Sequence, residues 1–358
     1  MLATSTHDTK RSADVRARIN ALSEFPGEWA RQLAQWERAH RDLKRRVRDK
    51  LAPDAQMQYV LYQTLVGLWP TREPGAEERN ALCERVSALA RKAAREAKAR
   101  TSWTDPDEEY ESALAAFIRA LFERAEFLRE LRAFVGTIAP ASAWNAIART
   151  VLHLTSPGVP DIYQGDELWN YALVDPDNRR PVSYDARERL LAELEAMSPS
   201  GDIPQLLSQL QFTAFDRDAI KLALVRTLLQ LRAAHHPLFA HGSYLPLTAH
   251  GSLGKHVVAF ARRLHPLAPA PLSSPAAIIV APRLTHAFAP TAPPMGELWR
   301  DTVLQLPSDL ADHRWRDAIS GRELTLPPHA STDPASPIAI PISSVLATAP
   351  VAVLVAIP

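Results

Sequence analysis

Residues 157–167 read Pro-Gly-Val-Pro-Asp-Ile-Tyr-Gln-Gly-Asp-Glu, and this stretch decides the fold class. Its first two residues favour a tight turn, residues 162–163 are typical of a short strand, and a loop that carries carboxylates follows. The preceding residues, 142–154, place apolar side chains along one side of a helix. A helix that leads through a turn into a strand and a polar loop is the repeating unit of a parallel α/β barrel.

Helical patterns dominate the sequence before this unit, from residue 13 to about residue 132. Apolar residues in 29–47 recur at steps of three, four or seven and predict one amphipathic helix. The pattern restarts over 57–68, and 77–100 is rich in helix-forming residues. Asp105, which precedes a proline and three acids, predicts the start of another helix.

The character of the sequence changes toward its C-terminus. Residues 219–231 are apolar on most sides, as in an outer barrel helix that another domain covers. Beyond His241, short apolar alternations divided by turn residues predict an antiparallel β domain. Strands are expected at 256–262, 277–280 and 351–355. The proline-rich residues 264–274 predict a surface loop or an extended spacer.

Charge balance and cysteine content narrow the classes of function. Lys and Arg number 41 against 40 Asp and Glu, so no net field attracts nucleic acid or an anionic membrane. The basic cluster 44–48 lacks interleaved aromatics and favours a solvated helix face. A single cysteine, Cys83, excludes an internal disulfide framework and fits a packing residue in a reducing cytoplasm. No apolar run reaches the roughly 20 residues that span a bilayer, and the first residues lack a basic stretch followed by an apolar one, so we expect a soluble protein that is not exported.

His7-Asp8 is the strongest candidate for chemistry near the start of the chain. Cleavage of a glycosidic bond passes through an oxocarbenium-like state, which a fixed carboxylate stabilises, and a neutral histidine can donate a hydrogen bond to the same sugar. The dipeptide alone is weak evidence. A buried structural pair, or a helix cap in which Asp8 caps the segment beginning at Thr9, explains it as well.

The wider strings carry a resemblance to a known family. Ser-Thr-His-Asp-Thr-Lys-Arg-Ser at 5–12 resembles the segment of the α-amylase clan that holds the third catalytic carboxylate, in the form typical of maltooligosyltrehalose synthases. Residues 157–167 are similar to the clan's segment at the eighth barrel strand. Leu-Val-Asp-Pro-Asp-Asn-Arg-Arg-Pro-Val at 173–182 looks like the synthase loop over the active site, and 315–322 resembles a strand and turn of the synthase's C-terminal β domain.

The resemblance implies a role for each candidate residue. Asp8 is expected to stabilise the transition state and His7 to contact substrate. The remaining candidate substrate-binding residues are Lys10, Arg11, Asp175, Asn178 and Arg179. Tyr163 and Glu167 are expected to be structural residues near the site.

Simpler explanations stay open for several of these residues. Lys10 and Arg11 could pair with Asp14 or point into solvent. Asp175 and Arg179 could form an ion pair within an Asx-turn loop. The histidines lack metal-ligand spacing, and no phosphate loop or nucleophile elbow occurs, so neither a metal nor a cofactor is implied.

The resemblance implies an α/β plus all-β fold that is the C-terminal part of a (β/α)8 barrel, with a large helical insertion and an antiparallel β-sandwich domain. The expected division is 1–12 as the end of strand 7 with the acid motif, 13–135 as the insertion, 136–236 as helix 7, strand 8, active-site loop and helix 8, and 237–358 as the β domain. The clan's nucleophile and general-acid segments are absent, so the chain looks truncated and inactive alone.

Three hypotheses follow for the function. The first is the C-terminal part of an intramolecular transglycosidase of trehalose biosynthesis, which rearranges a maltooligosaccharide. Such a chain is expected in the cytoplasm and needs an upstream barrel half as its partner. Neither nucleic acid nor a membrane is expected as a partner. The second is a glucan-binding or scaffolding remnant without catalysis. The third is part of an amylase-type hydrolase, which would release reducing sugar once complemented.

Overall fold

The computed structural model describes residues 1–197, 203, 206, 218–264, 275–310, 313–326 and 338–357. The chain divides into two compact units. We call His7–Ser142 with Asn170–Arg180 the helical unit, and Met1–Thr6 with Ala143–Trp169 and Pro181–Pro358 the sheet unit. The segment 170–180, which the sequence groups with the barrel, thus belongs to the helical unit. Residues 265–274 of the expected spacer lie outside the described residues.

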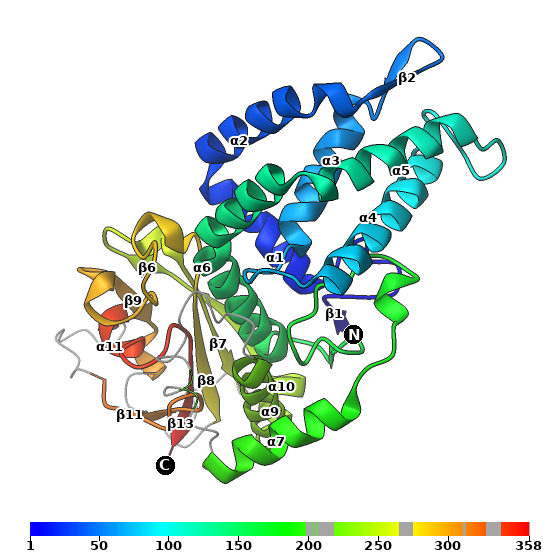
Figure 1. The fold of residues 1–358 in the computed structure, drawn as a ribbon. Coiled ribbons are helices and arrows are strands. Elements are labelled where there is room, and N and C mark those ends of the chain that lie inside the picture. Colours follow the sequence, from blue (N-terminus) through cyan, green and yellow to red (C-terminus); the bar gives the residue numbers. More distant parts are fainter. Residues whose placement is uncertain are drawn as a thin grey trace. The chain divides into compact units, whose positions relative to one another are not determined.

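The helical unit is built from α-helices that pack on one another (Figure 1). They are α1 (Ala13–Ala21), α2 (Pro26–Ala39), α3 (Ala55–Leu68), α4 (Ala76–Ala97), α5 (Glu108–Glu123) and the first part of α6 (Ala125–Thr155). Helix α3 contacts α1 and α4, and α4 contacts α5. Gly67 permits the α1–α3 contact, because a Cβ at this position would lie 2.8 Å from Cγ1 of Val15.

Side-chain caps fix where three of these helices begin. Ser12 accepts from the amide of Val15 at α1, and Asp54 accepts from that of Met57 at α3. At α5 the cap is Asp107, whose Oδ1 lies 3.0 Å from the amide nitrogen of Tyr110. The prediction that this helix starts at Asp105 was therefore wrong by two residues. The chain between α4 and α5 makes its turn before it reaches the cap.

The expectation of one amphipathic helix over 29–47 was also wrong at its C-terminal end. Helix α2 ends at Ala39, and an antiparallel hairpin follows, formed by β2 (Arg45–Val47) and β3 (Lys50–Ala52). Its two turn residues have positive φ, 47° at Arg48 and 62° at Asp49. Two such residues form the kind of tight turn that suits a hairpin. The basic cluster 44–48 is consequently on a hairpin and not on a helix face.

Helix α6 runs without interruption from Ala125 to Thr155, although Pro140 lies inside it. The sequence predicts a separate helix over 142–154. Buried side chains flank the proline on both sides, at Ile138 and Trp144 among others. Because a proline inside a helix costs about 3 kcal/mol, burial of these neighbours is what keeps the helix continuous.

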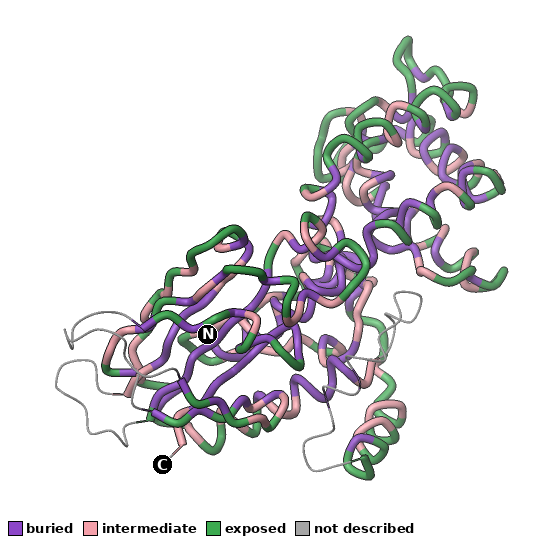
Figure 2. The backbone as a smooth tube through the Cα atoms, turned by 90° about the vertical axis from the view of Figure 1, so that its left-hand side faces the viewer, coloured by how far each residue is buried: buried purple, intermediate pink, exposed green. Residues whose placement is uncertain are grey.

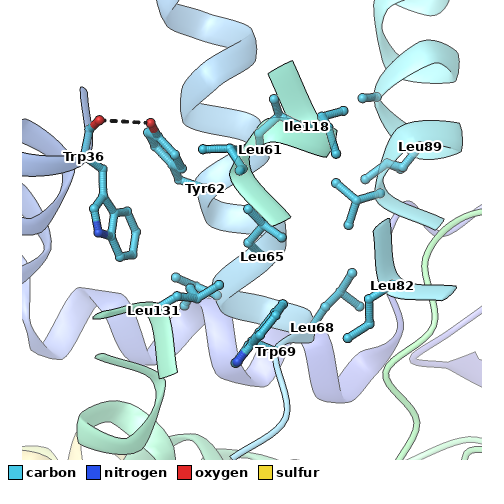
Figure 3. Close-up of a cluster of buried hydrophobic side chains, with 14 of the residues drawn as sticks. Trp36, Leu61, Tyr62, Leu65, Leu68, Trp69, Leu82, Leu89, Ile118 and Leu131 are labelled. Carbon is cyan, nitrogen blue, oxygen red and sulfur yellow. Dashed lines mark hydrogen bonds between the residues drawn. The ribbon is translucent and has the colours of Figure 1, made fainter. Parts of the chain in front are cut away.

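One buried cluster holds the helical unit together (Figure 3). Its centre is the apolar face of α3, where Leu61, Leu65 and Leu68 meet side chains of α4, α5 and α6. Trp36 of α2 is fully buried, and the Tyr62 hydroxyl donates to its carbonyl oxygen at 3.3 Å. Helices α3 to α5 therefore sit on a fixed core, which positions their exposed faces.

The sheet unit begins with two short parallel strands, β1 (Leu2–Ala3) and β4 (Pro160–Asp161). The expected strand at 162–163 lies two residues too late, because the chain has left the extended ladder by Ile162. Helices α7 (Tyr184–Met197), α9 (Asp218–Ala234) and α10 (His236–His241) follow. Helix α9 covers the predicted 219–231, and its residues from Ile220 to Val225 are all buried.

Within the described residues, the rest of this unit forms two antiparallel sheets, as the alternating pattern predicts. The larger has the order β11 (Glu323–Leu324), β10 (Arg314–Asp317), β13 (Ala352–Ile357), β8 (Ala276–Pro282), β7 (Val257–Arg263) and β5 (Ser243–Leu247). The smaller has the order β12 (Ile338–Pro341), β9 (Val303–Leu306) and β6 (Ala249–His250). A one-turn helix, α11 (Ile342–Val345), follows β12.

Side chains of both sheets enter one buried cluster, including Ile278 and Leu354 from the larger sheet and Leu304 and Ile340 from the smaller. Strand β8 is buried at every position, and Figure 2 colours each described part of the backbone by its burial. Strand β10 and the turn after it occupy the predicted 315–322, where Gly321 has a φ of 71°. No described helix has both the length and the apolarity to span a bilayer.

Candidate functional site

Parts of the two predicted site strings 5–12 and 173–182, namely residues 7–12 and 173–180, run side by side in the helical unit. The side-chain amide of Asn178 donates through Nδ2 to the carbonyl oxygen of His7 at 2.9 Å, and the backbone of Arg11 forms an isolated bridge with that of Leu173. The amide of Ser12 donates to the carbonyl oxygen of Ala172 at 2.8 Å. Residues more than 150 positions apart in sequence therefore form one local surface.

The side chains of His7 and Asp8 are exposed to solvent. Their side chains form a contact of 3.2 Å between Nε2 and Oδ2, and they are 53% and 85% exposed. The alternative of a buried structural pair was therefore wrong. The alternative that Asp8 caps a helix was also wrong, because Ser12 is the residue that caps α1. Both side chains are accessible to a large polar ligand.

Lys10 and Arg11 use partners that the sequence did not indicate. Lys10 pairs with Glu96 of α4 at 2.8 Å, and Arg11 donates to the hydroxyl of Thr64 of α3 at 2.7 Å. Burial lowers the pKa of the Arg11 guanidinium. The expected alternative, an ion pair of these cations with Asp14, is replaced by these contacts.

Asp175 and Arg179 form the ion pair that the sequence left open as the simpler explanation, with 2.7 Å between Oδ1 and Nε. The guanidinium remains 55% exposed and the carboxylate 36% exposed, so both are still able to contact a ligand. Helix α4 anchors the same residue, because Nζ of Lys92 donates to the carbonyl oxygen of Asp175 at 2.7 Å.

Asp177 is the best-held acid of the loop. Arg85 of α4 donates to both of its carboxylate oxygens, at 2.8 and 2.9 Å, and also to the carbonyl oxygen of Tyr171. Burial opposes ionisation of Asp177, but the hydrogen bonds and charge of Arg85, with help from the Leu173 amide and Arg180, place its pKa below the usual value. The carboxylate is therefore ionised and fixes the loop to α4.

Sequence reasoning missed the contribution of α4. Arg85, Lys92 and Arg95 lie on one helix face, since they are seven and three positions apart. This spacing of three cations on one face of the predicted helix was the sequence signal that could have indicated a contact with another segment. Which loop Arg85 and Lys92 face cannot be read from the spacing, because their partners lie 92 and 83 positions away.

Tyr163 and Glu167 belong to the sheet unit, unlike the other predicted site residues. The Glu167 carboxylate pairs with Arg187 of α7, which also donates to the carbonyl oxygen of Gly165 at 3.3 Å. The carbonyl oxygen of Tyr163 accepts from the amide of Asp166. Such contacts are compatible with a structural role in holding the loop. The roles of both residues stay predictions.

A cavity of about 620 Å³ lies in the helical unit between α4 and the 173–180 segment. Asp175 and Asp177 form part of its wall, and Trp103 completes it from the loop between α4 and α5. His7 and Asp8 are not among its lining residues. Within the described ranges, no three His, Cys, Asp or Glu side chains gather as a metal-binding set.

Comparison with known proteins gives a consistent result, although no family model matches the sequence. A protein of Mycobacterium tuberculosis, assigned as a maltooligosyl trehalose synthase, is 33% identical over 321 residues, which is 90% of this chain and 34% of the relative. The structure of maltooligosyltrehalose synthase from Arthrobacter ramosus matches with a TM-score of 0.72 and 31% identity, over 99% of this chain and 38% of that one. A hypothetical maltooligosyl trehalose synthase from Sulfolobus tokodaii matches with a TM-score of 0.62 and 26% identity, over 98% and 38%.

These matches define the class first: the chain is similar in sequence and in fold to trehalose synthases. The particular proteins that it resembles are the maltooligosyl trehalose synthases, and it matches the C-terminal portion of their chains. The chain spans about a third of the length of the curated relatives it matches. The resemblance that the sequence strings indicated is thus confirmed.

Proposed function

We propose that this chain supplies the C-terminal part of a (1→4)-α-D-glucan 1-α-D-glucosylmutase. The whole enzyme breaks the α-1,4 bond between the anomeric carbon of the penultimate glucose and O4 of the reducing-end glucose of a maltooligosaccharide. The same anomeric carbon then bonds to O1 of that end glucose, which gives an α,α-1,1 linkage. The proton of the O1 hydroxyl leaves as O4 gains one, so the reaction is an isomerisation without an oxidant.

One observation carries the proposal. The segment of His7 and Asp8 is joined to the loop of Asp175 and Asn178 by the Asn178–His7 hydrogen bond and the Arg11–Leu173 bridge. The two segments resemble the synthase family at separate places in the sequence, and only folding makes them neighbours. Their proximity supports a single sugar-binding surface.

Within this proposal Asp8 stabilises the positive charge that develops on the sugar ring, and a neutral His7 donates a hydrogen bond to a hydroxyl of the same ring. Lys10, Arg11, Asp175, Asn178 and Arg179 bind other hydroxyls. The nucleophile and the general acid come from an N-terminal barrel half, which is the protein partner. Keeping water from the glycosyl-enzyme favours closure of the new bond over hydrolysis.

The finer architecture belongs to the same proposal. The parallel pairing of β1 with β4 supports their assignment as strands 7 and 8 of a (β/α)8 barrel, with α9 as its last helix. The single cluster between the two antiparallel sheets supports a β-sandwich for the C-terminal domain. A cytoplasmic location, without nucleic acid or membrane, fits a neutral sugar substrate.

A chimera tests the function. In it, this chain replaces the matched C-terminal portion of the Arthrobacter ramosus enzyme, and the purified protein is incubated with maltopentaose. We expect reducing ends to disappear while the total carbohydrate stays constant. A rise in reducing ends would instead identify a hydrolase. Binding of maltopentaose without any change in reducing ends would identify a non-catalytic glucan-binding protein.

A further inference from the structure

Trp103 is an unusually exposed tryptophan at the edge of the 620 Å³ cavity. It lies in the loop between α4 and α5 and is 57% exposed. A large apolar ring in water loses the free energy that its burial would gain, so an exposed tryptophan beside a cavity indicates a contact surface. Its ring faces water in a molecule that buries Trp36, Trp69 and Trp144 almost completely.

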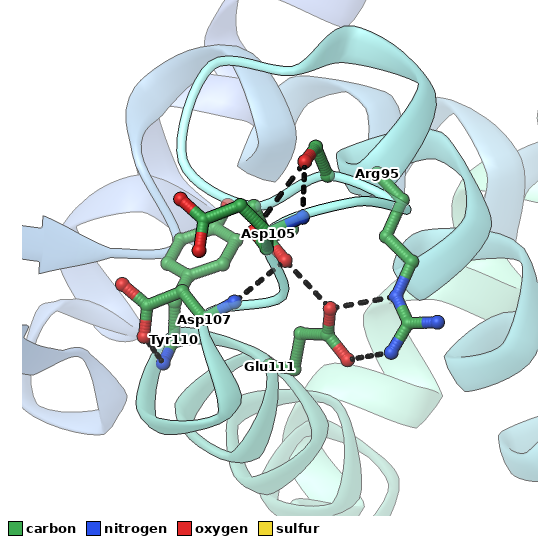
Figure 4. Close-up of polar contacts among 7 residues, drawn as sticks. Arg95, Asp105, Asp107, Tyr110 and Glu111 are labelled. Carbon is green, nitrogen blue, oxygen red and sulfur yellow. Dashed lines mark hydrogen bonds and ion pairs between the residues drawn. The ribbon is translucent and has the colours of Figure 1, made fainter.

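The loop that carries Trp103 is held in place before any ligand binds. The Arg95 guanidinium lies 5.0 Å from the centre of the Trp103 ring, and it forms a two-point ion pair with Glu111 at 2.8 and 2.7 Å. Thr101 donates to Glu111 and accepts from the amide of Asp107, the cap of α5 (Figure 4). A ring held in this way binds without a large loss of conformational entropy.

Among the described residues, five cations and three acids line the cavity, and all the cations except Arg91 already have partners. Arg85 and Arg180 are both engaged by Asp177, and Arg95 is engaged by Glu111. The Nζ of Lys92 donates to the carbonyl oxygen of Asp175. Except at Arg91, an anion would therefore compete with bonds already made, and it would meet carboxylates on the same wall. A polyhydroxylated sugar can add hydrogen bonds to these groups without displacing their partners.

We propose that this cavity binds part of an α-1,4-glucan chain, with a glucose unit stacked on Trp103 and its neighbours directed toward Asp175. The volume suits a short oligosaccharide. Asp175 is shared with the proposed sugar-binding surface, so the cavity extends that surface along α4. The glucan as ligand class rests on the proposed function, whereas the site itself rests on the cavity and on Trp103.

Calorimetry of the isolated chain with maltohexaose tests the site. We expect the wild-type chain to bind, and Trp103→Ala to weaken the affinity about tenfold through loss of the stacking surface. Trp103→Tyr keeps an aromatic ring and should stay within about threefold of wild type. Tyr184→Ala removes a ring that is 67% exposed in the sheet unit and serves as the matched control, with unchanged affinity.

A second variant blocks the cavity without touching the ring. Ala88 is an exposed α4 residue of the wall, and Ala88→Met fills the space with an apolar side chain that suits a helix. We expect it to lower the affinity about as much as Trp103→Ala, with the same circular dichroism spectrum as wild type. Wild-type affinity in both variants would overturn the proposal, as would stoichiometric binding of inorganic phosphate in place of maltohexaose.

Failure of the site and failure of the proposed function give different results. If the chimera consumes reducing ends equally well with and without the Trp103→Ala substitution, at saturating and at limiting maltohexaose, the function stands and the site is overturned. Trp103-dependent binding by the isolated chain, with an inactive chimera, would support the site and overturn the function.

Discussion

The Arg85 guanidinium donates hydrogen bonds to both oxygens of the Asp177 carboxylate, at 2.8 and 2.9 Å, and so connects α4 to the loop that carries Asp175 and Asn178. Both side chains are largely buried, with 18% and 12% exposed. The pair is one of the links between the helices of this unit and the proposed sugar-binding surface, beside the Lys92–Asp175 hydrogen bond. Its removal should therefore act on the surface as well as on stability.

Arg85→Met should destabilise the helical unit by about 3 kcal/mol, because it leaves the Asp177 carboxylate buried without its main partner. Urea unfolding followed by circular dichroism measures this. Arg31→Met is the matched control, since Arg31 and Glu28 form an exposed pair on α2 and its loss should change stability by no more than about 0.5 kcal/mol. Equal effects of the two variants would show that the Arg85–Asp177 pair does not hold the loop.

Asp8→Asn should lower the mutase activity of the chimera by at least about a hundredfold, because the carboxylate charge that stabilises the transition state is lost. Its 85% exposed side chain predicts an unchanged melting temperature. Glu126→Gln, a change of an exposed carboxylate with 77% of its side chain accessible, is the control for charge. Full activity of Asp8→Asn would remove Asp8 from the catalytic assignment.

His40 should make stability depend on pH. Burial, followed by the charge of Arg124, lowers its pKa from 6.5 to about 4, and its Nδ1 lies 2.8 Å from the Tyr62 hydroxyl. Between these pKa values the unfolded chain binds the extra proton, so stability falls as the pH decreases. The expected loss is about 2 kcal/mol from about pH 7 to about pH 5.

Urea titrations at both pH values measure this loss in the wild type and in His40→Gln, which cannot take up the proton. The variant should lose less stability than the wild type by roughly the same 2 kcal/mol. Identical pH dependence in the two proteins would mean that His40 titrates normally in the folded state.

Arg262→Met should destabilise the sheet unit by about 3 kcal/mol or more. This guanidinium is almost fully buried and donates to backbone carbonyl oxygens, each of which would be left without that donor. The acceptors are Thr155, Leu238, Phe239, Gly242 and Ser243. Thr155 and His241 end α6 and α10, so the cation also opposes the negative ends of helices.

Thermal unfolding of Arg262→Met measures the effect. Arg314→Met, which breaks an exposed pair with Glu323 on the edge of the same sheet, is the matched control and should shift the melting temperature little. A large shift in the control with none in Arg262→Met would contradict the anchoring role of Arg262.

Local patterns were sufficient for elements that depend on local interactions. The apolar spacing of 57–68 predicted α3, and short apolar alternations divided by turn residues predicted β7, β8 and β13. The predictions over 29–47 and 142–154 were wrong about where the helices begin and end, because backbone turns and tertiary packing determine these ends. Two left-handed residues at 48–49 turn the chain into a hairpin, and burial on both sides of Pro140 keeps α6 continuous.

Residue types at short spacing were enough to indicate the family, the antiparallel β character of the C-terminal part and the two segments that carry His7, Asp8, Asp175 and Asn178. Folding was needed to show that the two segments touch, that Arg85 and Lys92 hold the loop, and that Trp103 faces a cavity. Such contacts join residues many positions apart, and their energies depend on burial and charge pairing that no local pattern encodes.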